Sequence, residues 1–167
     1  MLVGSNPQLR YLRVIDLGAC IGCGACEAVC DFIHDGRPFI RVYRTSTGLD
    51  VPLSCFHCSK APCVEVCPTG AMTRDQSGAV YVEASKCIGC LACLYACPFS
   101  IPELDPVVKV SSKCDLCRPL RSKGLNPACA AICPAGAILY GEEALVYEAG
   151  KRRVAESLAK ARFESLR

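Results

Sequence analysis

The sequence predicts a small α+β fold of short hairpins and short helices, with one longer helix at its C-terminal end. Three observations lead to this prediction. Sixteen cysteines among 167 residues are typical of proteins whose interior is organised by crosslinks or metal. Short alternating or β-branched stretches precede three groups of these cysteines. Residues 142–167 lack cysteine and proline and carry apolar residues at helical spacing.

Metal is favoured over disulfides as the use of these cysteines. The first residues, MLVGSNPQLRYLRV, contain no apolar stretch of the ~7 to 15 residues found in a signal peptide. The one Arg-Arg pair is at 152–153, far from the start. We therefore expect a cytoplasmic chain with reduced thiols, although a partner's signal is a second route to export. No run approaches ~18 apolar residues, so no membrane span is expected.

The formal net charge of +3 does not argue for nucleic acid as a partner. It counts every cysteine as a neutral thiol, whereas metal-bound cysteines are thiolates. With sixteen thiolates and four iron-sulfur cores of roughly +2 each, the net charge becomes about −5. No nucleic-acid partner is expected, and a DNA-reading module that an iron-sulfur regulator needs is not apparent.

The cysteines form four groups of four, with none left over. The groups are Cys20, Cys23, Cys26 and Cys30; Cys55, Cys58, Cys63 and Cys67; Cys87, Cys90, Cys93 and Cys97; and Cys114, Cys117, Cys129 and Cys133. The first and third have the spacing CxxCxxCxxxC of bacterial ferredoxins, which bind 4Fe-4S clusters. The second and fourth widen the same gap. We call them motifs 1 to 4 in chain order.

The spacing suggests that each motif divides its cysteines between two clusters. Three closely spaced cysteines wrap one cluster, and glycines such as Gly22, Gly24 and Gly89 let the backbone approach it. The fourth cysteine lies about one helical turn further, or ~6 Å along the chain, and is expected to bind the neighbouring cluster. The proline that follows it in motifs 2 to 4 is expected in the first turn of a helix.

Zinc is the alternative metal. Cys114, Cys117, Cys129 and Cys133, taken alone, match a four-cysteine zinc site. The triplets of the other motifs do not divide into the paired knuckles that zinc favours. A zinc-stabilised binding module therefore remains a distant alternative, which visible absorption would separate at once because iron-sulfur proteins are brown.

The segments between the motifs are expected to be short and extended. Tyr11–Leu17, Ala79–Glu83 and Val107–Val110 are predicted strands. Arg37–Arg44 is predicted to form an exposed hairpin. Residues 1–141 are predicted to be one four-cluster unit, in which an inner module of about 50–104 is inserted between outer parts 10–49 and 105–141. Residues 142–167 form the tail, with a helix after Gly150.

The four motifs resemble the iron-sulfur electron-transfer subunits of molybdenum and tungsten oxidoreductases and of related formate dehydrogenases and hydrogenases. The phrases CIGCGACEAVCDFIH, CFHCSKAPCVEVCPTGA, KCIGCLACLYACPF and KCDLCRPLRSKGLNPACAAICPAGA carry this resemblance. It implies two interlocked double-cluster ferredoxin modules, in which the outer motifs pair with each other and the inner motifs likewise. It also implies the ligand sets. Set 1 is Cys20, Cys23, Cys26 and Cys133; set 2 is Cys30, Cys114, Cys117 and Cys129; set 3 is Cys55, Cys58, Cys63 and Cys97; set 4 is Cys67, Cys87, Cys90 and Cys93.

The resemblance also implies partners. The short chain looks most like small polyferredoxin subunits, including those of tungsten aldehyde oxidoreductases of anaerobic metabolism. A catalytic subunit with a tungsten or molybdenum cofactor is one expected partner, and a flavoprotein, a ferredoxin or another copy is the second. A formate dehydrogenase or hydrogenase is the alternative complex. No catalytic constellation, phosphate loop or dinucleotide motif appears, so the chain is not expected to be catalytic alone.

Four further residues lie beside ligand cysteines. His34 and His57 are expected to hydrogen-bond or pack rather than bind metal, because four thiolates complete each cluster. Lys86 and Lys113 directly precede a cysteine, where a charge can stabilise a reduced cluster, but solvated side chains are expected. The tail is expected to pack on the body or to dock a partner with the help of Lys151, Arg152 and Arg153.

Overall fold

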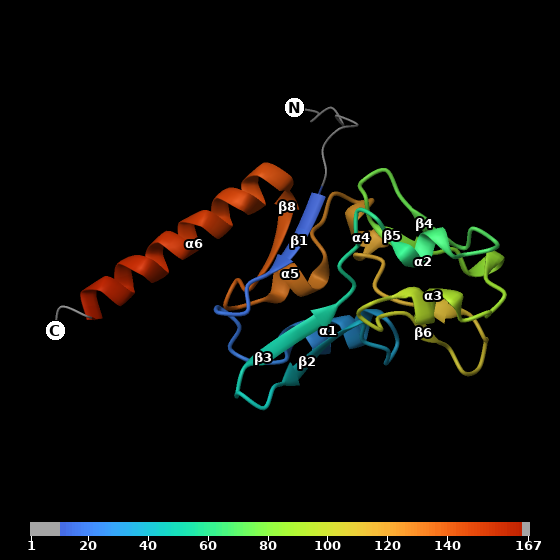
Figure 1. Cartoon of the computed structure of the whole chain (residues 1–167), viewed down its shortest axis with the longest axis horizontal. Coiled ribbons are helices and arrows are strands. Elements are labelled where there is room, and N and C mark those ends of the chain that lie inside the picture. Colours follow the sequence, from blue (N-terminus) through green and yellow to red (C-terminus); the bar gives the residue numbers. More distant parts are fainter. Residues whose placement is uncertain (1–10, 165–167) are drawn as a thin grey trace.

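The computed structural model describes residues 11–164 and has the α+β architecture that the sequence predicts (Figure 1). The strands are β1 Tyr11–Ile15, β2 Ile40–Arg44, β3 Asp50–Ser54, β4 Met72–Arg74, β5 Val80–Val82, β6 Glu103–Leu104, β7 Ser111–Ser112 and β8 Ile138–Glu142. The helices are α1 Ala25–Ile33, α2 Pro62–Glu65, the 3-10 helix η1 Ala84–Lys86, α3 Ala92–Ala96, α4 Arg118–Arg121, α5 Ala128–Ile132 and α6 Glu143–Glu164. The ends of the two predicted units, residues 1–10 and 165–167, lie outside the described residues.

Strands β1 and β8 join the two ends of the cysteine-bearing region. They pair antiparallel from Tyr11 opposite Glu142 to Ile15 opposite Ile138. This pairing brings α1 of motif 1 against α5 of motif 4. A buried cluster of Cys26, Cys30, Ile40, Cys129 and Ile138 lies beneath them. Motifs 1 and 4 therefore lie side by side despite their distance in the sequence.

The hairpin predicted within Arg37–Arg44 is confirmed only in part, because this stretch contains its first strand, β2, and the second strand lies further along the chain. This second strand, β3, pairs with β2 from Ile40 opposite Ser54 to Arg44 opposite Asp50, and so the hairpin crosses the predicted border between 49 and 50. Pro52 is tolerated in β3 because a two-stranded sheet has only edge strands. Ile40 anchors the hairpin, since only 1% of its surface is exposed.

The second buried cluster lies under the β4–β5 hairpin. Ala61, Cys63, Met72, Val80 and Cys93 form it, and helices α2 and α3 pack against one another beside it. Strand β5 lies where Ala79–Glu83 predicted a strand. Motifs 2 and 3 therefore share a core of their own.

The prediction of a strand at Val107–Val110 is wrong. These residues form the turn between β6 and β7, and Val107 and Val108 are exposed. The Asp105 carboxylate accepts hydrogen bonds from the amide N–H groups of Val107 (2.8 Å) and Val108 (3.1 Å). Such a carboxylate-capped turn competes with extended structure and outweighs the β propensity of the valines.

Helix α6 begins at Glu143, directly after β8, rather than after Gly150 as predicted. Gly150 is inside the helix, where a Cβ would meet nothing within 4 Å. Val146 is buried, and Arg153 donates to Asp16 Oδ2 (3.2 Å) and to the carbonyl oxygen of Gly136. After Arg153 the helix projects away from the body, and residues 154–162 are exposed (Figure 1). Within residues 11–164, no helix is both long and apolar enough to cross a bilayer.

Candidate metal centres

Three hollows are each lined by four cysteines, three from one motif and one from another. The first hollow has Cys20, Cys23, Cys26 and Cys133; the second has Cys55, Cys58, Cys63 and Cys97; the third has Cys67, Cys87, Cys90 and Cys93. The remaining lining residues are mostly apolar, among them Ile21, Phe56 and Ile88. These groups coincide in composition with sets 1, 3 and 4 of the sequence analysis.

The other four cysteines also lie near one another. Thiolate charges on Cys114 and Cys129 act on both Cys30 and Cys117. Burial is the main cause that raises the pKa of Cys117 to about 12, the amide of Ala128 lowers it, and the two nearby thiolates raise it further. A metal that binds Cys117 must displace its proton. Among the described residues, no three Cys, His, Asp or Glu side chains are grouped as for a single metal ion.

Every motif turns its backbone in the same way between its first two cysteines. The residue before the second cysteine has a positive φ in each loop: Gly22 (66°), His57 (49°), Gly89 (67°) and Leu116 (60°). Sequence reasoning anticipated the glycines but missed His57 and Leu116. A Cβ at Gly89 would collide with the carbonyl oxygen of Lys109, and one at Gly22 with the Asp50 side chain. The loops are thus held in one shape by the hairpins packed over them.

In motifs 2 to 4 the helix ends before the fourth cysteine, which corrects the prediction that the proline after this cysteine begins a helix. Helices α3 and α5 end directly before Cys97 and Cys133, and these two residues are extended, with ψ of 115° and 108°. A residue before proline disfavours the helical region. The proline therefore ends the helix and holds the fourth cysteine extended. Motif 1 has Asp31 at this position, and α1 continues past Cys30 to Ile33.

Backbone amides donate hydrogen bonds to the cysteine sulfurs. The donor and acceptor pairs are Phe39 to Cys30 (3.2 Å), His57 to Cys55 (3.4 Å), Met72 to Cys67 (3.3 Å), Ser111 to Cys87 (3.3 Å) and Leu116 to Cys114 (3.4 Å). N–H donors stabilise thiolate charge and help to set the potentials of iron-sulfur clusters. Four-cysteine hollows with amide donors fit 4Fe-4S clusters, whose chemistry is the uptake and release of single electrons.

The two histidines behave as expected. His57 accepts a hydrogen bond at Nδ1 from the amide of Val80 (3.0 Å). The rings of His34 and Phe39 meet edge to face with their centroids 4.7 Å apart. His57 therefore ties the loop of motif 2 to strand β5, and His34 packs against Phe39, directly before β2.

The two lysines that precede a cysteine differ from each other. Lys86 is solvated as predicted, with its side chain 54% exposed and paired with Glu83 at 2.7 Å. The prediction for Lys113 is wrong, because only 5% of its surface is exposed. Its Nζ is 3.5 Å from Cys55 Sγ and 3.0 Å from the carbonyl oxygen of Cys114, and it also donates to the carbonyl oxygen of Val80. Nothing in the sequence separates the two lysines.

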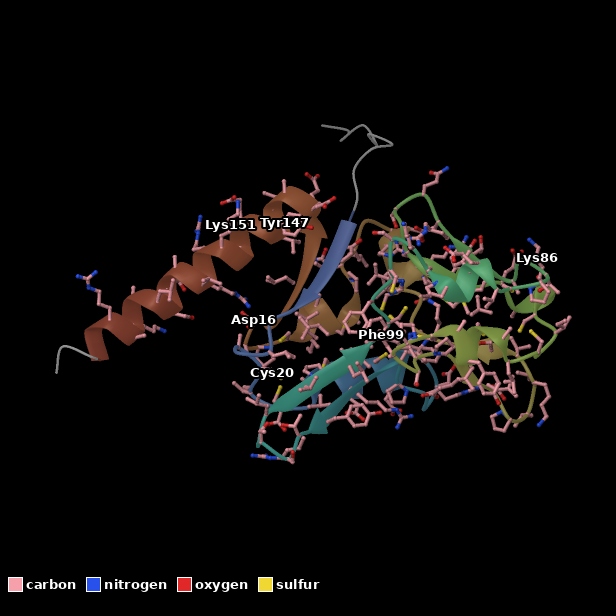
Figure 2. The ribbon with its side chains drawn as sticks, in the orientation of Figure 1. Asp16, Cys20, Lys86, Phe99, Tyr147 and Lys151 are labelled. Carbon is pink, nitrogen blue, oxygen red and sulfur yellow. The ribbon has the colours of Figure 1, made fainter. Side chains whose placement is uncertain are left out.

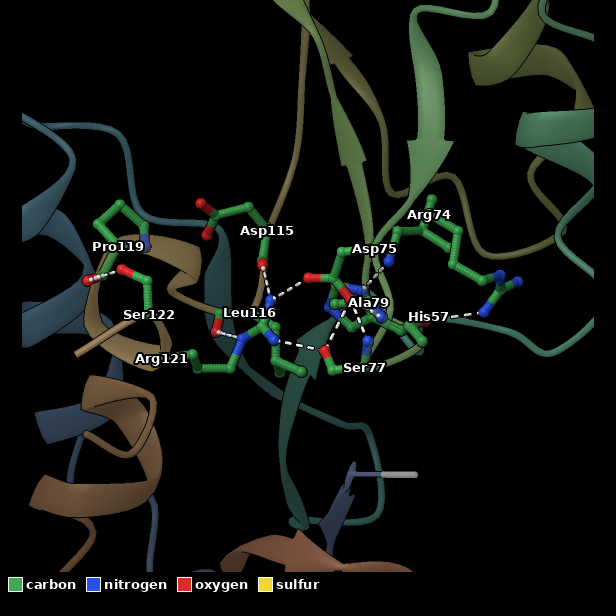
Figure 3. Close-up of polar contacts among 12 residues, drawn as sticks. His57, Arg74, Asp75, Ser77, Ala79, Asp115, Leu116, Pro119, Arg121 and Ser122 are labelled. Carbon is green, nitrogen blue, oxygen red and sulfur yellow. Dashed lines mark hydrogen bonds and ion pairs between the residues drawn. The ribbon is translucent and has the colours of Figure 1, made fainter. Parts of the chain in front are cut away.

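A second contact joins motif 4 to the inner segment (Figure 3). Arg121 of α4 is only 9% exposed and pairs with Asp75 Oδ2 at 2.7 Å. It also donates to Ser77 Oγ (2.5 Å) and to the carbonyl oxygen of Leu116 (2.8 Å). Burial acts to raise the pKa of Asp75, but hydrogen bonds from Ser77 and Arg121, with the charge of Arg121, outweigh it and lower the pKa. Arg121 therefore fastens α4 to the β4–β5 turn.

Comparisons with known proteins identify the class of metal centre to which these cysteines belong. Residues 47–143 match the 4Fe-4S dicluster domain, and residues 13–32 match the 4Fe-4S binding domain. Three relatives have names that state a reaction. The thiosulfate reductase electron transfer subunit of Salmonella typhi is 41% identical over 79% of this chain and 76% of its own length. One component of the polysulfide reductase of Wolinella succinogenes is 34% identical over 80% and 76%. One component of the sulfite dehydrogenase of Allochromatium vinosum is 38% identical over 77% and 67%.

The cysteine pattern, the four groups of thiols and the relatives agree on the cofactor and on the role of the chain. The sixteen cysteines fit four 4Fe-4S clusters. The chain belongs to the 4Fe-4S dicluster family and is an electron-transfer subunit of an oxidoreductase complex.

Proposed function

We propose that this chain carries single electrons through four clusters, from one end of its body to the other, for a catalytic subunit with a molybdenum or tungsten cofactor. Sets 1 to 4 of the sequence analysis are the proposed ligands. The observation that carries the proposal is the lining of the three hollows, in which a fourth cysteine from a different motif completes each group. A chain of this length has a diameter of about 40 Å, so four clusters in a row span most of it.

Contacts between sets support the order 1, 2, 3, 4 along this row. Cys26 of set 1 lies near Cys129 of set 2. Cys55 of set 3 is close enough to Cys114 of set 2 for the thiolate charges to interact. Cys63 of set 3 and Cys93 of set 4 share one buried cluster. In this order, sets 1 and 4 are the two terminal sets.

The proposed terminal sets are also the most accessible. Cys23 of set 1 and Cys90 of set 4 are exposed, whereas the other fourteen cysteines are buried or half-buried. Beside them, the apolar side chains of Ile21 and Ile88 are 66% and 67% exposed. Cys20 of set 1 and Lys86, which directly precedes Cys87 of set 4, lie at opposite ends of the body (Figure 2). Each end therefore offers an apolar contact beside an accessible ligand.

The partner's substrate is proposed from the relatives. Their names state reactions of thiosulfate, polysulfide and sulfite, which favours an inorganic sulfur compound over the aldehyde expected from the sequence. Anaerobic co-purification of the complex, with metal analysis and activity assays on both substrate classes, tests this. We expect about sixteen irons per chain, an attached subunit with molybdenum or tungsten, and turnover of a sulfur compound. Turnover of aldehydes alone would support the aldehyde substrate expected from the sequence and contradict the sulfur compound. Zinc in place of iron would contradict the cluster proposal.

The proposal that a different partner contacts each end of the row is tested with one variant at each end. Ile21→Asp and Ile88→Asp place a charge in the contact beside set 1 and set 4, respectively. Each variant should keep all four clusters and lose electron exchange with a different partner, one the catalytic subunit and the other a flavoprotein, a ferredoxin or another copy. If both variants slow exchange with the same partner, the two ends do not have the proposed roles.

The exposed part of α6 is proposed to hold one neighbour at the set 1 end. Arg153 already contacts the body, and Lys151 pairs with Glu148 at 2.9 Å, so the proposed docking surface is the exposed stretch 154–162 rather than the basic residues first considered. A chain ending at Arg153 retains the anchored half of the helix and should lose a partner but no iron. Unchanged assembly of that truncated chain would remove the tail from the proposal.

The cytoplasmic location stays a prediction, for which cell fractionation of the intact complex is the measurement.

A further inference from the structure

The position of Lys113 carries an inference about how electrons are distributed along the row. Lys113 lies at the junction of two proposed sets. Its ammonium group is 3.5 Å from the sulfur of Cys55 in set 3, and it directly precedes Cys114 of set 2 and donates to its carbonyl oxygen. It lines the hollow that contains the four cysteines of set 3.

The ammonium group of Lys113 faces sulfur and carbonyl oxygens rather than a carboxylate. The ion pairs of the described residues do not include Lys113. Its hydrogen-bond partners are one thiol sulfur and two carbonyl oxygens. A buried ammonium without an anionic partner is strongly unfavourable. The site is therefore suited to a neighbouring group that is anionic and becomes more so on reduction.

We propose that Lys113 is a positioning residue that raises the reduction potential of the cluster on Cys55, Cys58, Cys63 and Cys97. This inference rests on the proposed ligand sets. Lys113 takes part in no bond change while one electron leaves one cluster, which is oxidised, and reaches the next, which is reduced. Because Lys113 is buried, salt screens its charge less than that of a surface lysine. An electron arriving from either side is thus favoured at the middle of the row.

Three variants of the full chain in its complex test the inference. Lys113→Met keeps the length of the apolar stem and removes the charge, whereas Lys113→Arg keeps the charge. Lys86→Met is the matched control, because Lys86 also precedes the first cysteine of a motif but is exposed. The readouts are iron content and the midpoint potentials from a redox titration followed by electron paramagnetic resonance. The signal of set 3 is assigned from a Cys58→Ser variant.

For Lys113→Met we expect one midpoint, that of set 3, to fall by at least the equivalent of a tenfold change in the reduction equilibrium, which is about 59 mV for one electron. Lys113→Arg should restore most of this shift, and Lys86→Met should leave every midpoint unchanged. Loss of the set 3 cluster in Lys113→Met but not in Lys113→Arg would also support a role for the charge.

Two results would overturn the inference. One is an unchanged set of midpoints in Lys113→Met with about sixteen irons bound. The other is a Lys113→Arg variant that shifts, or loses iron, as much as Lys113→Met, which would assign Lys113 a packing role. Failure of the proposed function is distinguishable, because it would appear in the unmodified chain as fewer than four clusters.

Discussion

The outer pair of motifs and the inner pair reach the same arrangement by closures of very different length. Motifs 1 and 4 are joined by β1 and β8, whose paired residues run from 11–15 to 138–142. Motifs 2 and 3 are joined locally, through the β4–β5 hairpin between them. Each doubling of a loop costs only about 0.6 kcal/mol more. One cluster-binding pair can therefore be inserted into another at little entropic cost, and the contacts between the pairs become the feature to test.

The largest expected effect comes from removing the fourth cysteine of one outer and one inner motif. Cys30→Ala should destroy or alter the cluster on Cys114, Cys117 and Cys129, and Cys97→Ala the cluster on Cys55, Cys58 and Cys63. Each variant should lose up to about four irons. Thiol alkylation followed by mass spectrometry identifies which cysteines become reactive. Reactivity confined to the remaining cysteines of the variant's own motif would contradict the exchange of ligands in that pair.

A smaller effect is expected from the contact between the pairs at Arg121. Arg121→Met leaves the partly buried carboxylate of Asp75 without its cation, and breaking a buried ion pair costs about 3 kcal/mol. The anaerobic thermal-unfolding midpoint of the iron-loaded chain measures the loss. Arg118→Met is the control on the same helix. Arg118 is exposed and lies over the Tyr81 ring at 4.2 Å, and the loss of such a cation–π contact is expected to cost about 0.5–1 kcal/mol. Equal shifts in the two variants would show that Arg121 does not fasten the pairs together.

The sequence predicted the parts of this molecule that depend on spacing within a motif. The four cysteine groups, the α+β class and the first strand of the hairpin that begins at Ile40 follow from residues close in the chain. Lys113 could not be predicted, because its burial depends on β5 and on Cys55, which come from other segments. The positive φ of Leu116 was missed for the same reason, since a buried leucine gives no local sign that packing holds it in a left-handed conformation.

Two left-handed residues at equivalent helix starts in motifs 1 and 3 provide the smallest test of the comparison. Gly24 precedes α1 in motif 1 with φ 72°, and Leu91 precedes α3 at the equivalent place in motif 3 with φ 66°. A left-handed conformation costs a residue with a side chain about 1–2 kcal/mol. A Cβ at Gly24 meets nothing within 4 Å, so Gly24→Ala should lower stability by about 1 kcal/mol through backbone strain alone.

Leu91→Gly removes the same strain from the inner pair but also removes a half-buried side chain that lines the hollow of set 4. Burial of part of a leucine contributes about 1 kcal/mol, so the two changes nearly cancel. The thermal-unfolding midpoint should therefore fall for Gly24→Ala, whereas the stability of Leu91→Gly should stay within about 0.5 kcal/mol of the unmodified chain. A neutral Gly24→Ala would mean that the loop of motif 1 does not need its left-handed residue. A large loss in Leu91→Gly would mean that packing around set 4 outweighs the strain that the leucine bears.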